Sequence, residues 1–316
     1  MARWIVRRIA ASVAVLLAVS AAIFFLGRAA APGNVATTII GAGGATTQQR
    51  LALERKLGLT RPLYDQYGSW LLGVLHGQFG TSPISGRSAT SVIAQEAPVS
   101  IEIALLALLL ATLVGVAVGI AAAVNANGLG DYAVRAVAMT GLSVPVFVVG
   151  TLLVLGAAHY APSLYSASYT SFFADPAANL QAMILPVLTA ALPIGALIVQ
   201  MTRATILEEL HQPYMLAATA RGISRRRLLG VHALKTALPP LLTFQAFQFG
   251  ILLGSLFLVE QIFSLPGLGR GIIADIGNRD YVLVEAEAMV IAAAFVLANL
   301  LVDLVDPLID PRKRVA

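Results

Sequence analysis

The sequence predicts an all-α integral membrane protein, and two observations support this prediction. Of the 316 residues, 58% are hydrophobic and only 12% are charged, whereas about 25% of residues are charged in a typical soluble domain. Long stretches without Asp, Glu, Lys or Arg also recur along the chain. Because a soluble core cannot hide that much apolar surface, the composition excludes a soluble enzyme. A disordered chain, which is poor in hydrophobic residues, is excluded as well.

Six apolar stretches predict six membrane helices, since a span needs roughly 20 apolar residues. We place the helices at residues 8–28, 100–124, 134–158, 183–205, 240–262 and 286–306. The first could instead be a secretory signal, but its charge-free run, Ile9–Gly27, exceeds the usual apolar core of roughly 7–15 residues. We therefore expect a retained anchor.

The next four spans rest on longer charge-free runs, which are Ile103–Gly130, Ala136–Ala174, Pro176–Thr202 and Thr236–Val259. The second half of Ala136–Ala174 is polar and rich in tyrosine, so only its first half is placed in a membrane. The last span is the shortest on this criterion. Acidic residues flank Ala288–Val302 on both sides, yet that core is too apolar for a loop.

Basic residues predict the orientation. With both termini in the cytoplasm, 13 of the 21 Lys and Arg residues fall on the cytoplasmic side, as the positive-inside rule requires. We therefore expect a multi-pass membrane protein with both termini in the cytoplasm and divide it into three parts. These are an anchor helix with an external segment (1–99), a membrane domain (100–306) and a cytoplasmic tail (307–316). Within the external segment, Tyr64–Leu75 predicts a short helix.

The most unusual cytoplasmic segment is the basic loop 207–238. Tyr214–Arg221 predicts a short alanine-rich helix that Gly222 ends, and Ser224 can cap a second helix beginning at Arg225. The pair Pro239-Pro240 is expected to end that second helix. The loop could lie on anionic lipid through Arg225–Arg227 or dock into a cytoplasmic partner, and its composition leaves both readings open.

Polar and helix-bending residues inside the spans admit two readings each. Pro145, Pro186 and Pro193 could mark bends along a pathway or ordinary kinks. Gln200, Gln245 and Gln248 could line a polar pathway or hydrogen-bond between helices. Glu260 could pair with a peptide amino terminus or with a neighbouring arginine. The pairs Gly115/Gly119 and Gly250/Gly254 have the i, i+4 spacing of closely packed helices.

Several chemistries are excluded. The chain has no cysteine, so it holds no disulfide or thiolate metal site. Its four histidines show no paired spacing, and no metal site is predicted. No Gly-x-x-x-x-Gly-Lys-Ser/Thr motif occurs, so the chain is not expected to be an enzyme that hydrolyses ATP.

The loop resembles the "EAA" loop of permease subunits in binding-protein-dependent ABC importers. That pattern is a Glu-Ala-Ala triplet, a glycine four residues later, and a histidine and a proline beyond. Here Leu216-Ala217-Ala218 takes the triplet's place, and Gly222, His232 and Pro239 follow. Leu216 departs from the acidic residue of the pattern, as often happens in the dipeptide/oligopeptide (peptide/nickel) branch.

Other segments are similar to the same branch, in the same order along nearly the whole chain. They are Trp4–Ile9, Gly58–Leu63, Gly77–Gly80, Gly141–Phe147, Phe263–Gly269, Arg279–Tyr281 and Asp306–Arg312. The resemblance implies a type I ABC importer transmembrane domain in the bacterial inner (plasma) membrane. This domain would form half of a pathway for di- or oligopeptides.

The resemblance also implies partners and roles. The partners would be a homologous second permease, two cytoplasmic ABC ATPases and an external substrate-binding protein, within a lipid bilayer and without nucleic acid. ATP and Mg would be bound by the ATPases, and this chain would hold no cofactor. The implied ATPase-coupling residues are Leu216, Ala217, Ala218, Gly222, Ser224, Arg225, Arg226, His232 and Pro239. The expected pathway residues are Ser143, Pro145, Gln200, Gln245, Gln248 and Glu260. The residues expected to dock the binding protein are Leu265, Pro266, Gly267, Asp280 and Tyr281.

Three alternatives remain at this point. The same architecture could import nickel or another small solute. An ion-coupled secondary transporter would show internal repeats and its own ion site, and neither is evident. An integral membrane enzyme would need a cluster of acid, base or nucleophile groups, and the sequence shows none.

Overall fold

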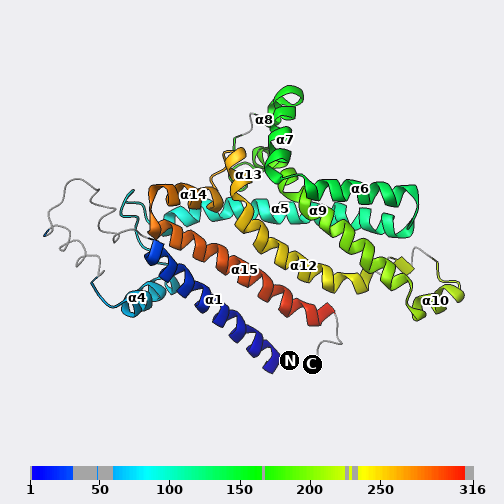
Figure 1. The fold of residues 1–316 in the computed structure, drawn as a ribbon, viewed down its shortest axis with the longest axis horizontal. Helices are drawn as coiled ribbons and strands as arrows, with labels where there is room; N and C mark the ends of the chain where they lie inside the picture. The colour runs from blue at the N-terminus through cyan, green and yellow to red at the C-terminus, as the bar shows by residue number, and fades with distance from the viewer. Residues whose placement is uncertain are drawn as a thin grey trace.

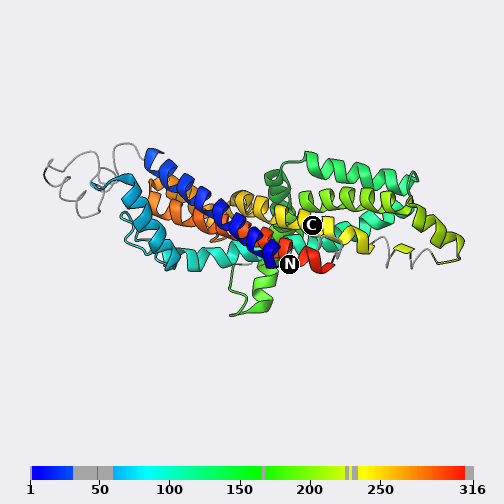
Figure 2. The same ribbon diagram turned by 90° about the horizontal axis from the view of Figure 1, so that it is seen from below.

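The computed structural model describes residues 2–30, 48, 60–165, 168–224, 228–229 and 234–309. Within them the chain forms a long bundle of helices (Figures 1 and 2). The helices are α1 (Ala2–Ala30), α4 (Leu63–Leu75), α5 (Ala89–Val124), α6 (Leu129–Ser143), α7 (Val146–Tyr160), α8 (Pro162–Tyr165), α9 (Pro176–Leu210), α10 (Pro213–Ala220), α12 (Leu234–Ser255), α13 (Phe257–Ile262), α14 (Leu268–Asn278) and α15 (Tyr281–Ile309). The all-α membrane fold class predicted from the sequence is confirmed.

Helices α5 and α9 form the centre of the bundle. They have 36 and 35 residues, which corresponds to about 54 Å at 1.5 Å per residue, so both exceed a hydrocarbon core of roughly 30 Å. Asp175 caps the start of α9, where its carboxylate accepts hydrogen bonds from the backbone N–H groups of Ala177 and Ala178 at 3.1 and 3.0 Å. The two helices therefore define the long axis that Figure 1 shows.

Small residues let α5 and α9 approach each other closely. A Cβ atom added at Gly115 would lie 2.8 Å from Cγ2 of Ile198, and one added at Gly119 would lie 2.7 Å from Cβ of Thr202. Both are closer than real Cβ contacts, so only glycine fits at either position. The predicted close packing at this pair of glycines is confirmed. Gly250 likewise faces Phe295 of α15, whereas Gly254 has open space around it.

Helix α1 runs antiparallel to α15. At one end Arg8 pairs with Asp303 at 2.6 Å, and at the other Arg28 pairs with the buried Glu285 at 3.2 Å. The short helix α4 folds back onto α1, where Ser20 and Tyr67 share a hydrogen bond of 2.8 Å. The predicted helix at Tyr64–Leu75 is thus present as α4 (Figure 1). We call the end of the bundle with α4 the α4 end, and the opposite end, with α10, the α10 end.

Two spans differ from the sequence prediction. The span predicted at 134–158 is wrong as one straight helix, because α6 and α7 meet at a bend of 100°. Pro145 causes the break: it disfavours helical backbone at the preceding residue, and Val144 is extended. The span predicted at 240–262 is divided into α12 and α13, which meet at Leu256.

The expectation that Pro239-Pro240 ends a helix is also wrong, since both prolines lie inside α12. They are the sixth and seventh residues of the helix. Because proline has no N–H, the backbone carbonyls four residues before each of them receive no helical hydrogen bond, and these carbonyls lie in the first turn of α12. Pro239 is buried, and packing against neighbouring helices supports a helix that contains proline. Helix α9 similarly continues through Pro186 and Pro193.

Four of the described helices, α1, α5, α9 and α15, are long and apolar enough to cross a membrane, and the bent pair α6–α7 makes up to five. The predicted count of six depends on α12 and α13 together serving as a further span.

We predict that Gly115→Val lowers the free energy of unfolding by about 1–3 kcal/mol, because the added atoms overlap Ile198 in a packed interface. The matched control is Gly156→Val on α7, where an added Cβ meets no atom within 4 Å. Thermal melting of the purified protein in detergent measures both. Equal melting temperatures for the two variants would contradict the packing described here.

Candidate functional site

Helix α10 is a short helix at the α10 end of the bundle (Figure 1). Pro213 occupies its first turn, where a missing N–H costs nothing. One face packs inward through Met215 and Ala218, which are 1% and 6% exposed. Tyr214 and Ala217 are exposed on the outer side. The helix therefore presents a small apolar face to its surroundings.

Gly222 ends this helix in a left-handed conformation, with φ of +80°. The N–H of Gly222 donates to the carbonyl of Thr219 at 2.9 Å, and the N–H of Ile223 donates to that of Ala218 at 3.3 Å. A Cβ at Gly222 would meet nothing within 4 Å. The glycine is needed for its backbone conformation, and the space beside it is open. The predicted helix and its glycine stop are confirmed.

The structure places only part of the expected coupling set around α10. Ala217, Ala218, Gly222 and Ser224 lie there, whereas Pro239 is buried in α12. The backbone of Leu216 belongs to α10, but its side chain lies outside the described part. Arg225, Arg226 and His232 also fall outside the described residues. The coupling roles stay predictions.

A polar hollow of about 600 Å³ lies between α6 and α9. It is lined by Arg135, Met139, Leu142, Ser143, Gln200 and Arg203. Two of the expected pathway residues, Ser143 and Gln200, are thus brought together, and both are exposed. The hydroxyl of Ser143 donates to the carbonyl of Met139 at 2.9 Å. Pro145 is exposed at the start of α7, two residues beyond Ser143.

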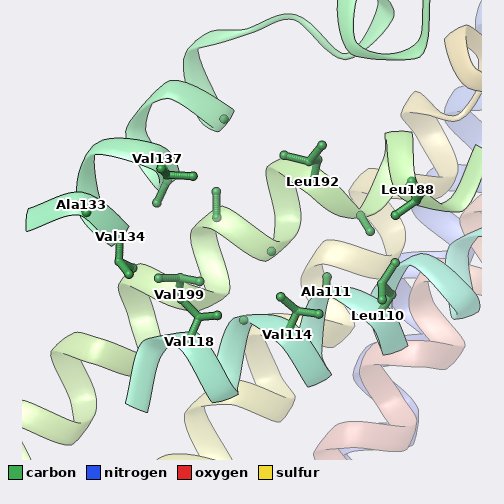
Figure 3. Close-up of a pocket in the computed structure, with 16 residues that line it drawn as sticks. Leu110, Ala111, Val114, Val118, Ala133, Val134, Val137, Leu188, Leu192 and Val199 are labelled. Carbon is green, nitrogen blue, oxygen red and sulfur yellow. The ribbon is translucent and has the colours of Figure 1, made fainter. Parts of the chain in front are cut away.

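The opposite face of α6 borders a different hollow, of about 450 Å³, over α5 and α9 (Figure 3). All sixteen residues that line it are Leu, Val, Ala or Gly. Val134 and Val137 of α6, Leu192 of α9 and Val114 of α5 surround it in Figure 3. The two hollows differ sharply in polarity, although a single helix separates them. In a bilayer the apolar one fits lipid or an apolar protein surface, and the polar one fits water.

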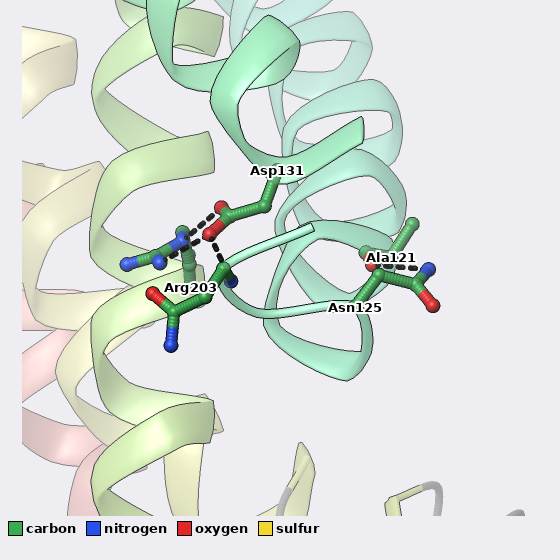
Figure 4. A network of polar contacts seen from close by, with 5 residues as sticks. Ala121, Asn125, Asp131 and Arg203 are labelled. Carbon is green, nitrogen blue, oxygen red and sulfur yellow. Dashed lines mark hydrogen bonds and ion pairs between the residues drawn. The ribbon is translucent and has the colours of Figure 1, made fainter. Parts of the chain in front are cut away.

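An ion pair fixes α6 to α9 beside the polar hollow (Figure 4). Nε and Nη2 of Arg203 lie 2.5 and 2.6 Å from the two carboxylate oxygens of Asp131. The Asp131 side chain is fully buried and also accepts a hydrogen bond from the N–H of Asn127 at 2.9 Å. Arg203 lies two turns before the end of α9, and α10 follows α9 directly. The pair therefore links the first turn of α6 to the helix that leads into α10.

The remaining expected pathway residues do not join this hollow. Nε2 of Gln245 donates to Oγ1 of Thr112 at 2.9 Å, an interhelical hydrogen bond between α12 and α5. Gln248 is buried and lines a separate cavity of about 160 Å³ between α9 and α12. Glu260 is fully buried; it accepts hydrogen bonds from Ser100 at 2.6 Å and from the N–H of Arg270 at 2.8 Å. It therefore caps the start of α14.

Most of the expected docking residues are buried near the α4 end. Leu265, Gly267 and Asp280 are buried, Pro266 is exposed and Tyr281 is half-buried. The hydroxyl of Ser82 donates to the carboxylate of Asp280, which ties the loop before α5 to the start of α15. In this conformation Pro266 and Tyr281 are the members of the set that a protein partner could touch.

An acidic cluster that sequence reasoning missed lies at the same end. Glu96 of α5, Asp275 of α14 and Glu287 of α15 converge around Gly271. Burial, together with the charge of Asp280, raises the pKa of Asp275. Among the described residues, no group of three or more His, Cys, Asp or Glu side chains is placed to hold a metal ion.

Sequence reasoning also missed the Asp131–Arg203 pair and the place of Arg135 in the polar hollow. In the sequence, Arg135 and Arg203 counted only toward the basic residues that predict the orientation in the membrane. The available signal was Asp131 itself, an acid beside a predicted span, which calls for a basic partner.

The chain matches family models over most of its length. Residues 115–315 match the family described as binding-protein-dependent transport system inner membrane component. Residues 1–94 match the N-terminal region of such membrane components. The chain belongs to this family. The predicted class, a permease subunit of a binding-protein-dependent transporter, is therefore confirmed, and membership of this family implies binding-protein and ATPase partners.

Similar proteins extend over nearly the full chain. A probable peptide ABC transporter permease protein of Sinorhizobium fredii is 38% identical over 98% of this chain and 99% of its own length. The glutathione transport system permease protein of Salmonella choleraesuis is 34% identical over 99% of both chains.

We predict that Asp131→Asn lowers the melting temperature of the protein clearly more than the control below does, because it leaves the Arg203 guanidinium without its carboxylate partner. The control is Asp303→Asn, which breaks the exposed pair with Arg8 and should cost about 0–1 kcal/mol. Both are measured by thermal unfolding in detergent. Equal effects would show that the Asp131–Arg203 pair does not fix α6 to α9.

Proposed function

We propose that this chain is one of two homologous permeases of an ATP-driven importer of small peptides, with both termini in the cytoplasm. The observation that carries the proposal is a short exposed helix, α10, joined through α9 and the Asp131–Arg203 pair to a polar hollow. The relatives named for peptide and glutathione transport support this substrate class, since glutathione is itself a small peptide. In this orientation the α10 end is cytoplasmic and the α4 end is external.

Helix α10 would sit in a groove of a cytoplasmic ABC ATPase. The exposed Ala217 and the open space beside Gly222 permit close approach by a partner, and the exposed Tyr214 offers it a larger contact. ATP and Mg would be bound by two separate ATPase subunits. Closure of these subunits would push α10, and the Asp131–Arg203 pair would carry that movement from α9 to α6, as a rigid-body change.

The pathway would run past the polar side of α6 between this chain and the second permease. Ser143 and Gln200 would border it. A substrate-binding protein would dock at the external end through Pro266 and Tyr281, while the buried Leu265, Gly267 and Asp280 would hold that surface in shape.

We predict that Gly222→Trp abolishes coupling: ATP hydrolysis continues in the assembled complex while peptide uptake is lost. The indole would block the partner groove, and its residue would be strained at a φ of +80°. Uptake of labelled peptide and phosphate release are measured in proteoliposomes that hold the complete complex.

The matched control is Gly86→Trp. Gly86 has φ of +71° and equally open surroundings, but it lies at the opposite end of the bundle. This variant should keep both uptake and stimulated ATP hydrolysis. If Gly222→Trp behaves like Gly86→Trp, the assignment of α10 as the coupling helix is wrong.

A further inference from the structure

Arg135 is the cation of the polar hollow that is not held in an ion pair within the described part of the chain. Arg203 is held by both oxygens of Asp131, whereas Arg135 makes no ion pair within the described part of the chain. Its guanidinium carbon lies 5.8 Å from the ring centre of Tyr132, a contact that orients the side chain without cancelling its charge. Arg135 is exposed, so its guanidinium donors are available to a ligand.

Polar groups of the right kind lie on the same side. Gln200 is exposed in the same hollow, and its amide offers a donor and an acceptor. The hollow has a volume of about 600 Å³, which is within the roughly 300–1,000 Å³ of small-molecule sites. A fork of guanidinium donors beside an amide suits a carboxylate, because an arginine can bind both of its oxygens at once.

We propose that Arg135, assisted by Gln200, binds the carboxylate of the transported peptide at the cytoplasmic half of the pathway. This inference rests on the proposed function, and it names a subsite within it. Arg135 would lower the cost of moving an anionic group past the apolar residues of α6 and would favour peptides with a free carboxyl terminus.

A phospholipid phosphate would offer Arg135 similar chemistry, but the two sides of α6 favour a soluble cargo. Acyl chains fit the opposite hollow, whose lining is wholly Leu, Val, Ala and Gly (Figure 3). On the Arg135 side, acyl chains would strand the amide of Gln200 without a hydrogen-bond partner.

The test compares one peptide in two forms, with a free carboxyl terminus and with a terminal amide. Uptake by the complete complex is measured in proteoliposomes for wild type, Arg135→Gln, Arg135→Lys and the control Arg61→Gln. Arg61 is an exposed arginine near the α4 end. Equilibrium binding of both peptides to the purified permease pair gives a second measurement that bypasses the binding protein.

We expect Arg135→Gln to weaken binding and uptake of the free acid by about ten- to a hundredfold and to leave the amide unchanged. Arg135→Lys keeps the positive charge but lacks the two-pronged guanidinium. Its binding and uptake of the free acid should lie between those of wild type and Arg135→Gln. Arg61→Gln should match wild type with both peptides.

Three results would overturn the inference. They are an equal loss for acid and amide, no loss for either, and a loss that follows the anionic lipid content of the vesicles instead of the peptide terminus. The last would assign Arg135 to a lipid phosphate. Failure of the wild-type complex to take up or bind any peptide would instead overturn the proposed function.

Discussion

The close approach of α5 and α9 is the constraint on which the rest of the structure depends. Gly115 and Gly119 have no side chain between their backbone and Ile198 and Thr202, so the two longest helices pack along their length. Lipid tails are as apolar as leucine, and helices in a bilayer therefore associate through van der Waals contact and hydrogen bonds. Small residues allow the close van der Waals contact between α5 and α9. The hydrogen bond from Gln245 to Thr112 joins α12 to α5.

Helix α6 depends on that central pair for its position. It borders an apolar hollow on one face and a polar hollow on the other, so a rotation of α6 would place Arg135 among apolar residues. The buried Asp131 prevents this rotation because both of its oxygens are held by Arg203 of α9. This ion pair, together with the packing of α6 on α9, holds Arg135 on the side of the polar hollow. The same pair joins α6 to α9, which is the connection that the proposed coupling to an ATPase requires.

The sequence predicted much of the candidate site and missed its organisation. Helix α10 and the stop at Gly222 followed from local rules, namely an alanine-rich run and a glycine able to take positive φ. The pathway residues could not be sorted in the same way. Gln200 and Gln245 look alike in sequence, yet one is exposed in the polar hollow and the other bonds to Thr112. Only the faces that their helices turn to neighbours distinguish them.

The sequence by itself determined that this is a helical membrane protein, where its apolar segments lie and which family it belongs to, because hydropathy and motif spacing are local properties. The tertiary structure decided what depends on distant partners. Pro145 became a bend of 100°, Pro239-Pro240 were absorbed into α12, and Glu260 capped α14. Each outcome depends on whether contacts with another helix stabilise a proline or a buried carboxylate in its local position. The place of Arg135 in the polar hollow also depends on distant residues, because Gln200 and Arg203, 65 positions or more further along the chain, form the opposite wall.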